Sequence, residues 1–152
     1  MSVKAFVLTI FSMCICHAVD ATSIDREQVY VVDGDTIRVY NEGPDVRLVG
    51  FNAPETRRAK CPEERALGDV ATRRLRDLVR SQPLDFDYVD CACPPGTEGT
   101  MACNFGRSCG TLKAAGRDVG EILIAEKLAV PFQCGANRCP KTPRPWCESP
   151  RP

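Results

Sequence analysis

The alternation of apolar and polar positions predicts three short strands early in the chain. Residues 28–32 are β-branched and aromatic, residues 36–40 alternate polar with apolar, and residues 46–51 form a further apolar run. The segments between them, 33–35 and 41–44, carry the Asp, Asn, Gly and Pro residues typical of turns. Three consecutive strands joined by tight turns predict a meander, which is how a β-sandwich or barrel begins.

Helical spacing of apolar residues predicts a long helix from Pro62 to about Arg80. Proline at the first position and two glutamates in the first turn suit a helix start. The predicted buried face consists of Leu67, Val70, Ala71, Leu75, Leu78 and Val79. The other faces carry the arginines Arg73, Arg74, Arg76 and Arg80. Such a run is either a track for phosphate groups or a solvated surface, and the solvated surface is the commoner meaning.

The second half of the chain alternates strands, a loop and one more helix. Residues 84–90 have the alternation of a strand with one wet face, and residues 107–113 form another candidate strand. The spacing of a capping box at 118–121 predicts a second helix over residues 119–127. Residues 131–152 are rich in proline and cysteine and predict an irregular segment. Five strands interleaved with two helices indicate an α+β fold.

The first residues have the order of an export signal. Lys4 supplies a positive charge, an apolar run continues to Cys16, and small residues follow. The run is shorter than the roughly 20 apolar residues that span a bilayer, so it is not a transmembrane helix. The alternative to an export signal is a buried N-terminal strand or helix. We expect residues 1–21 to be a signal peptide, residues 22–133 one domain, and residues 134–152 a tail rich in cysteine and proline. The mature protein is then periplasmic or secreted, without a membrane anchor.

Removal of residues 1–21 leaves eight cysteines and no histidine. An even number of cysteines in a small exported domain is typical of a disulfide framework, although the sequence leaves its connectivity open. A zinc site is the alternative, but the chain has no clean pair of Cys-x-x-Cys motifs. Without histidine, hydrolases that activate a nucleophile with imidazole are excluded, so any hydrolysis must use carboxylates, arginines and a metal ion.

The formal net charge is zero, with 20 basic and 20 acidic residues. Nucleic-acid-binding proteins are often basic overall, because phosphate contacts supply much of their affinity. A nucleic-acid site on this chain therefore has to depend on local arginine clusters rather than on the field of the whole molecule.

Polar residues gather where the predicted strands end. Asp35 closes the first turn, Arg47 interrupts the third apolar run, and Asn52 and Glu55 follow that run. If the strands pair as neighbours, Asp35, Asn52 and Glu55 converge. Their oxygens are of the type that calcium and magnesium prefer, and Arg47 beside them suits a bidentate phosphate contact. Taken singly, each is also an ordinary turn, strand or loop residue.

These residues occur in a pattern that resembles the staphylococcal nuclease (thermonuclease) family. The resemblance covers roughly residues 28–132. It rests on a two-part signature, Val31-Val32-Asp33-Gly34-Asp35-Thr36-Ile37 followed by Val46-Arg47-Leu48-Val49-Gly50-Phe51-Asn52-Ala53-Pro54-Glu55-Thr56. It continues through Phe105-Gly106-Arg107 and the predicted helix with the sequence Val119-Gly120-Glu121-Ile122-Leu123.

The resemblance implies a five-stranded oligonucleotide-binding barrel (OB-fold) with packed helices. It also implies a calcium-dependent endonuclease that hydrolyses phosphodiester bonds of DNA and RNA and leaves a 3′-phosphate. By matched positions, Asp35 and Asn52 would be metal ligands. Asn52 stands where the family often has a second carboxylate, and its neutral side chain should weaken calcium binding and can change the metal preference.

The resemblance also implies roles for four further residues. Glu55 would orient or deprotonate the attacking water, while Arg47 and Arg107 would stabilise charge on the phosphoryl oxygens. Phe105 would stack on a base of the substrate, with burial in the core as the alternative. Cysteines flank Arg107, and we expect disulfides from Cys103 and Cys109 to other parts of the chain, with Cys91 and Cys93 as candidates, to fix this arginine.

Two other classes of function remain open at this stage. One is a non-catalytic OB-fold module that binds nucleic acid, and the other is a disulfide-rich secreted structural or inhibitor domain. Retention of Asp35, Arg47, Glu55 and Arg107 together favours catalysis, and a structural domain leaves this pattern unexplained. The sequence does not distinguish DNA from RNA as the preferred substrate or reveal the biological role, and we expect a monomer.

Overall fold

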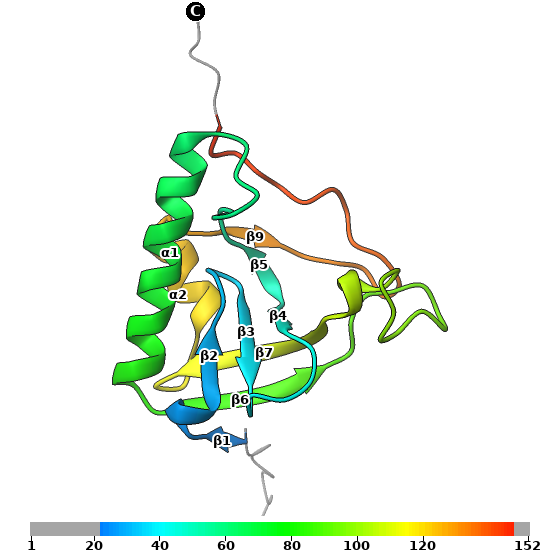
Figure 1. Ribbon diagram of the computed structural model, residues 1–152, viewed down its shortest axis with the longest axis horizontal. Coiled ribbons are helices and arrows are strands. Elements are labelled where there is room, and N and C mark those ends of the chain that lie inside the picture. Colours follow the sequence, from blue (N-terminus) through cyan, green and yellow to red (C-terminus); the bar gives the residue numbers. More distant parts are fainter. Residues whose placement is uncertain (1–21, 148–152) are drawn as a thin grey trace, which may run out of the picture.

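The computed structural model describes residues 22–147, which form an α+β fold around a curved, nearly closed sheet (Figure 1). The predicted signal peptide, residues 1–21, lies outside the described residues. The helices are α1 (Pro62–Ser81) and α2 (Val119–Ala125), with short 3-10 helices η1 (Arg26–Gln28) and η2 (Asn104–Gly106). The strands are β1 (Ser23–Ile24), β2 (Val29–Val31), β3 (Thr36–Val39), β4 (Val46–Leu48), β5 (Gly50–Asn52), β6 (Leu84–Val89), β7 (Ser108–Ala114), β8 (Arg117–Asp118) and β9 (Val130–Phe132).

The main sheet confirms the predicted meander. β2, β3 and β4 pair antiparallel in sequence order, with Val31 opposite Ile37 and Thr36 opposite Arg47. β4 then pairs in parallel with β7, which pairs antiparallel with β6, so the order is β1-β6-β7-β4-β3-β2. The parallel pairing of β4 and β7 places Arg47 opposite Cys109, two residues from Arg107.

The third predicted strand, residues 46–51, is two strands rather than one. Gly50 has a φ of 91°, a conformation that favours glycine, and the chain turns there out of the main sheet. β4 stays between β3 and β7, whereas β5 pairs with β9. β9 contains Pro131 and Phe132, so the predicted irregular segment was wrong for its first two residues. This proline-containing segment is a strand because it pairs with β5, and no local sequence pattern predicts that pairing.

The first helix begins at Pro62 as predicted and ends at Ser81, one residue beyond the predicted end. Its N-cap is Cys61, whose Sγ accepts a hydrogen bond from the N–H of Glu64. The predicted buried face was wrong at Val70, which is 39% exposed. The buried residues of the helix are instead Glu64, Gly68, Ala71, Thr72, Leu75, Leu78 and Val79. The second helix has the predicted cap, because the Asp118 carboxylate accepts hydrogen bonds from two backbone N–H groups.

Gly68 lies where α1 touches the segment that follows β5. A Cβ placed on Gly68 would be 2.8 Å from the carbonyl oxygen of Pro54 and 2.7 Å from that of Glu55. No side chain fits there without a shift of the backbone, so glycine allows α1 to pack directly on residues 54–55.

The eight cysteines of residues 22–147 form four disulfides, which confirms the predicted framework. The thiol groups that lie close enough to share a zinc ion are consumed in these bonds. The pairs are Cys61–Cys147, Cys91–Cys109, Cys93–Cys103 and Cys134–Cys139. No helix within the described part of the chain has the length and apolar character needed to cross a membrane.

Candidate active site

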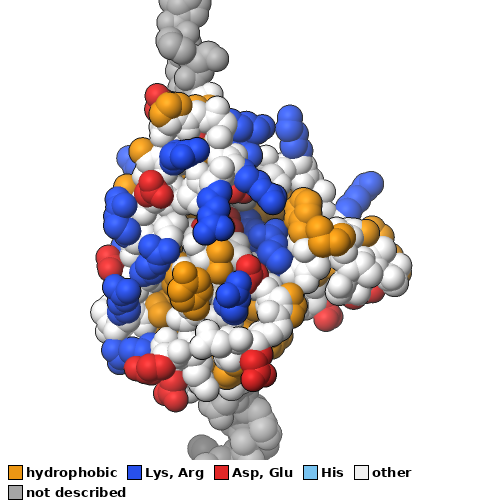
Figure 2. All heavy atoms as spheres, viewed as in Figure 1, with side chains coloured by type: hydrophobic (Ala, Val, Ile, Leu, Met, Phe, Trp, Pro, Cys, Tyr) orange, Lys and Arg blue, Asp and Glu red, His pale blue; other side chains and the backbone are white. Residues whose placement is uncertain are grey.

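One cavity of about 640 Å³ brings together every residue that the sequence singled out for chemistry. Its lining comes from the bend between β4 and β5, the loop 91–107 and the segment that follows β9. On the face shown in Figure 2, acidic and basic side chains lie next to one another near the middle, beside an apolar patch. The predicted residues that line the cavity are Asp35, Arg47, Asn52, Glu55, Phe105 and Arg107.

Asp35 is buried at the start of β3, with only 8% of its surface exposed. Its Oδ2 accepts a hydrogen bond of 2.8 Å from the N–H of Ala53, and its Oδ1 accepts one from the hydroxyl of Thr36. Burial raises the pKa of Asp35 to about 6, although Arg47 lowers it and Asp33 adds to the rise. The carboxylate is therefore poorly solvated and gains from any cation placed against it.

Arg47 is held by the backbone at the bend between β4 and β5. Nη1 donates to the carbonyl oxygens of Leu48 and Asp35, and Nη2 donates to that of Phe51. Nη2 also lies 3.1 Å from Oδ2 of Asp35 and 3.0 Å from Oδ1 of Asn52. This guanidinium thus spans the two residues that the resemblance assigned to the metal.

The contacts of Asn52 require a side chain that both accepts and donates hydrogen bonds, as an amide does. Its Oδ1 faces the Arg47 guanidinium, whereas its Nδ2 donates to the carbonyl oxygens of Ala53 and Pro143. A carboxylate here would place a second anionic oxygen against these two carbonyl oxygens, which is unfavourable in a buried site. The departure from the family pattern therefore goes together with a contact to the C-terminal segment.

Arg107 enters the same cavity from the other side. Nε and Nη2 donate to the backbone and side-chain oxygens of Asn104, and Nη1 donates to the hydroxyl of Thr36. No carboxylate of residues 22–147 forms an ion pair with it. Burial lowers the pKa of Arg107, and repulsion from Arg47 lowers it further, against partial compensation by Asp35. Of these two guanidinium groups only Arg47 has a carboxylate partner, Asp35, so the pair forms a place where an anion is stabilised.

The loop before Arg107 is locked by the disulfides expected for it. Cys109 pairs with Cys91 and Cys103 pairs with Cys93, so both cysteines that flank Arg107 are tied to the start of the loop. Phe105 is 67% exposed, and its ring lies 5.8 Å from the Arg107 guanidinium. The alternative that placed Phe105 in the core is therefore wrong, and the ring is free to contact a ligand.

Glu55 lines the cavity on a half-exposed loop, and the lining includes residues for which no role was predicted. Asp33, Asp90 and Arg138 add two carboxylates and a third guanidinium to the lining, and Phe132 adds a second ring. Asp33 belongs to the segment 31–37 on which the family resemblance rests, so the sequence contained a sign of its role. Asp90 ends the predicted strand 84–90 and had no predicted role, and Arg138 and Phe132 lie in the segment that was predicted to be irregular.

The oxygen donors of the cavity fit a divalent cation of the calcium or magnesium type. The two candidate ligand oxygens, from Asp35 and Asn52, already converge on one positively charged atom, Nη2 of Arg47. Since Asn52 contributes no charge, we expect binding to be weak, with Arg47 displaced from between the two oxygens.

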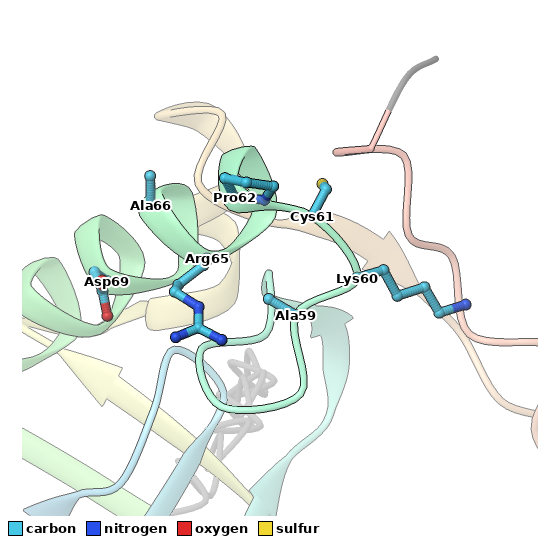
Figure 3. Close-up of a pocket in the computed structure, with 7 residues that line it drawn as sticks. All are labelled: Ala59, Lys60, Cys61, Pro62, Arg65, Ala66 and Asp69. Carbon is cyan, nitrogen blue, oxygen red and sulfur yellow. The ribbon is translucent and has the colours of Figure 1, made fainter.

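A second hollow of about 450 Å³ lies at the N-terminus of α1 (Figure 3). It is lined by Lys60, Arg65 and Asp69 together with small residues, and it contains none of the predicted site residues. We therefore assign the candidate active site to the larger cavity. No protein-family model matches this chain, and no curated protein matches it.

The raised pKa of Asp35 predicts a pH dependence of stability in the metal-free protein. Burial moves this pKa from 3.8 to about 6, so the folded state holds the proton more tightly than the unfolded chain. The contribution of Asp35 to stability therefore falls as pH rises from about 4 to about 6, by up to about 3 kcal/mol, and is constant above that range. Urea unfolding of wild type and Asp35→Asn in chelator measures this difference. A difference between the two proteins that does not vary with pH would contradict the prediction.

Proposed function

We propose that this protein is a metal-dependent endonuclease that hydrolyses phosphodiester bonds of DNA and RNA. The observation that carries the proposal is the grouping of Arg47 and Arg107 with Asp35 and Glu55 in one cavity. A phosphodiester is an anion whose negative charge is spread over its equatorial oxygens during attack by water, and two guanidinium groups match this distribution. Carboxylates beside them are suited to hold a cation and to accept a proton.

The arrangement suggests a division of roles among the residues of this chain. Asp35 and Asn52 would hold a divalent cation, Ca²⁺ by resemblance, which supplies positive charge next to the phosphoryl oxygens. Arg107 donates to one of these oxygens, and Arg47, once released from Asp35, donates to another. Glu55 accepts a proton as water forms its bond to phosphorus and the bond to the leaving sugar oxygen breaks.

Further features support the same proposal. The motif pattern resembles the staphylococcal nuclease family, and the curved sheet with two helices is compatible with the OB-fold that this family has. Phe105, exposed beside Arg107, provides a surface on which a nucleobase can stack. Four disulfides fit an oxidising compartment, so we propose that the protein is secreted or periplasmic. We expect it to be a monomer.

Cleavage of heat-denatured DNA and RNA by the oxidised protein tests the proposal. We expect activity with Ca²⁺ or another divalent cation and none with chelator. Glu55→Gln keeps the size and hydrogen-bonding capacity of the side chain but removes the base, and we expect it to lower kcat by roughly 10²–10⁴-fold. The products should carry 3′-phosphates.

One control variant and two alternative outcomes complete the experiment. Glu126→Gln removes a carboxylate that pairs with Arg74 on the surface and should leave the rate unchanged. Folded protein that binds single-stranded DNA but does not cleave it with any of the metals tested would support the alternative of a binding module. Folded protein that neither binds nor cleaves would support the structural or inhibitor domain.

A further inference from the structure

The C-terminal segment 140–147 contacts the candidate site at several points, although the sequence predicted only an irregular tail. Cys147 is bonded to Cys61, directly before α1. Pro143 accepts the hydrogen bond from Nδ2 of Asn52. Figure 3 shows this segment running beside the loop that leads through Lys60 and Cys61 into the helix. The tail therefore contacts Asn52 of the candidate site and Cys61 at the start of α1, both of which are far from it in sequence.

Glu64 connects this segment to the loop that begins with Glu55. Its side chain has no exposed surface, and its carboxylate accepts hydrogen bonds from the N–H groups of Lys60 at 2.8 Å and of Glu55 at 3.5 Å. The two ends of loop 55–60 are thus bonded to the two oxygens of one buried carboxylate. The same loop is also packed on α1 at Gly68.

Arg144 completes the connection. Its Nε and Nη2 donate to the two oxygens of Glu64 at 2.8 and 2.7 Å, a bidentate ion pair. Its Nη2 also donates to the carbonyl oxygen of Arg58, in the middle of loop 55–60. Burial raises the pKa of Glu64, but the hydrogen bonds from Arg144 and Lys60 outweigh it, so the group stays ionised. One guanidinium from the tail therefore holds both the loop and the carboxylate that anchors it.

We propose that segment 143–147 is a positioning element of the active site, in which Arg144 and the Cys61–Cys147 disulfide place Glu55 through the buried carboxylate of Glu64. This inference rests on the proposed function for the role of Glu55. Arg144 and Glu64 do not line the cavity, so they act through the loop and not on the substrate. A shift of about 1 Å in a group that takes a proton can cost about 10²-fold in rate, so a constraint on this half-exposed loop matters for catalysis.

Amide hydrogen exchange tests the physical part of the proposal without any substrate. In Arg144→Met, and separately in Cys61→Ser/Cys147→Ser, the amides of Glu55 and Lys60 should exchange at least about tenfold faster than in wild type. Serine keeps a hydroxyl acceptor for the helix cap, so the double variant removes the disulfide alone. Arg74→Met is the matched control, because Arg74 lies on the same helix as Glu64 and forms a bidentate pair with Glu126, which caps α2.

Steady-state kinetics on denatured DNA test the catalytic part. Arg144→Met should lower kcat by roughly 10–100-fold with little change in KM, and Arg74→Met should change neither. In a Glu55→Gln background, Arg144→Met should lower the residual rate by less than about threefold, because the two residues act through one group. The double cysteine variant should behave in the same way, so the test does not depend on the folding of one variant.

The outcomes separate the two proposals. Unchanged exchange at Glu55 and Lys60, or an equal loss of kcat in both backgrounds, would overturn the positioning role. If exchange is faster in the variants but the wild-type protein cleaves no nucleic acid, the link from Arg144 to loop 55–60 would stand and the proposed nuclease function would be rejected. Faster exchange with unchanged kcat in an active enzyme would also overturn the positioning role, since the loop would then move without consequence.

Discussion

Replacement of Arg107 by alanine should lower kcat for DNA cleavage about 10³-fold. An arginine that stabilises negative charge on a transferring phosphoryl group contributes about 10³–10⁵ in kcat. Arg107 is suited to this role because it enters the cavity without an ion-pair partner among residues 22–147 and lies close enough to Arg47 for the two charges to repel. Binding of a phosphate would relieve this repulsion, most strongly when the charge is greatest.

The prediction has two matched variants. Arg107→Lys keeps the charge but loses the planar fork that bonds to Asn104, so we expect an intermediate loss of kcat. Arg38→Ala removes an arginine from the same sheet that pairs with Asp45 outside the cavity, and should leave kcat unchanged. Single-turnover cleavage with saturating protein measures the chemical step. A loss below about tenfold in Arg107→Ala would show that this guanidinium does not stabilise the reacting phosphate.

Replacement of Arg144 by methionine should destabilise the protein by about 3 kcal/mol at pH 7. Methionine fills part of the space but leaves the Glu64 carboxylate fully buried without its bidentate partner, and such a change typically costs about 3–5 kcal/mol. Arg74→Met breaks an ion pair whose two side chains are 36% and 37% exposed, and should cost about 1 kcal/mol or less. Guanidinium chloride unfolding with the disulfides oxidised gives both values.

The pH dependence identifies Glu64 as the cause. Arg144 holds the pKa of Glu64 below its ordinary value of 4.5, so the stabilisation from the pair is present above that pH and is lost as the pH falls through the folded-state pKa. The difference in unfolding free energy between wild type and Arg144→Met should therefore shrink in acid, where Glu64 is protonated in both proteins. A difference that stays constant down to about pH 3 would assign the loss to packing instead.

The predicted strands and helices were correct where their signals are local. Pro62 and the acidic first turn marked the start of α1, and Asp118 marked the start of α2. The third strand was predicted as continuous, because the left-handed turn at Gly50 leaves no mark in an apolar run. Val70 was predicted as buried, because helical periodicity alone does not say which side of an apolar stripe meets the sheet.

In the candidate site, too, local sequence signals predicted some residues, whereas others depended on the tertiary structure. Asp35, Arg47, Asn52 and Glu55 lie within one stretch of the sequence, and their convergence followed from the pairing of neighbouring strands. Arg107 was added only through the resemblance, since the parallel pairing of β4 with β7 brings it to the cavity from another part of the chain. Their roles in catalysis stay predictions until activity is measured.

The sequence by itself determined the residue types of the cavity, the even set of cysteines, the absence of histidine after residue 21, and the local starts of both helices. These follow from composition and from spacings of a few residues. The tertiary structure alone decided which cysteines pair, that Glu64 is buried, and that Arg144 reaches it from 80 residues away. Such contacts depend on how the sheet curves and on where distant parts of the chain meet. A charged residue in a helix or in a proline-rich tail carries no local sign that a partner will be brought to it.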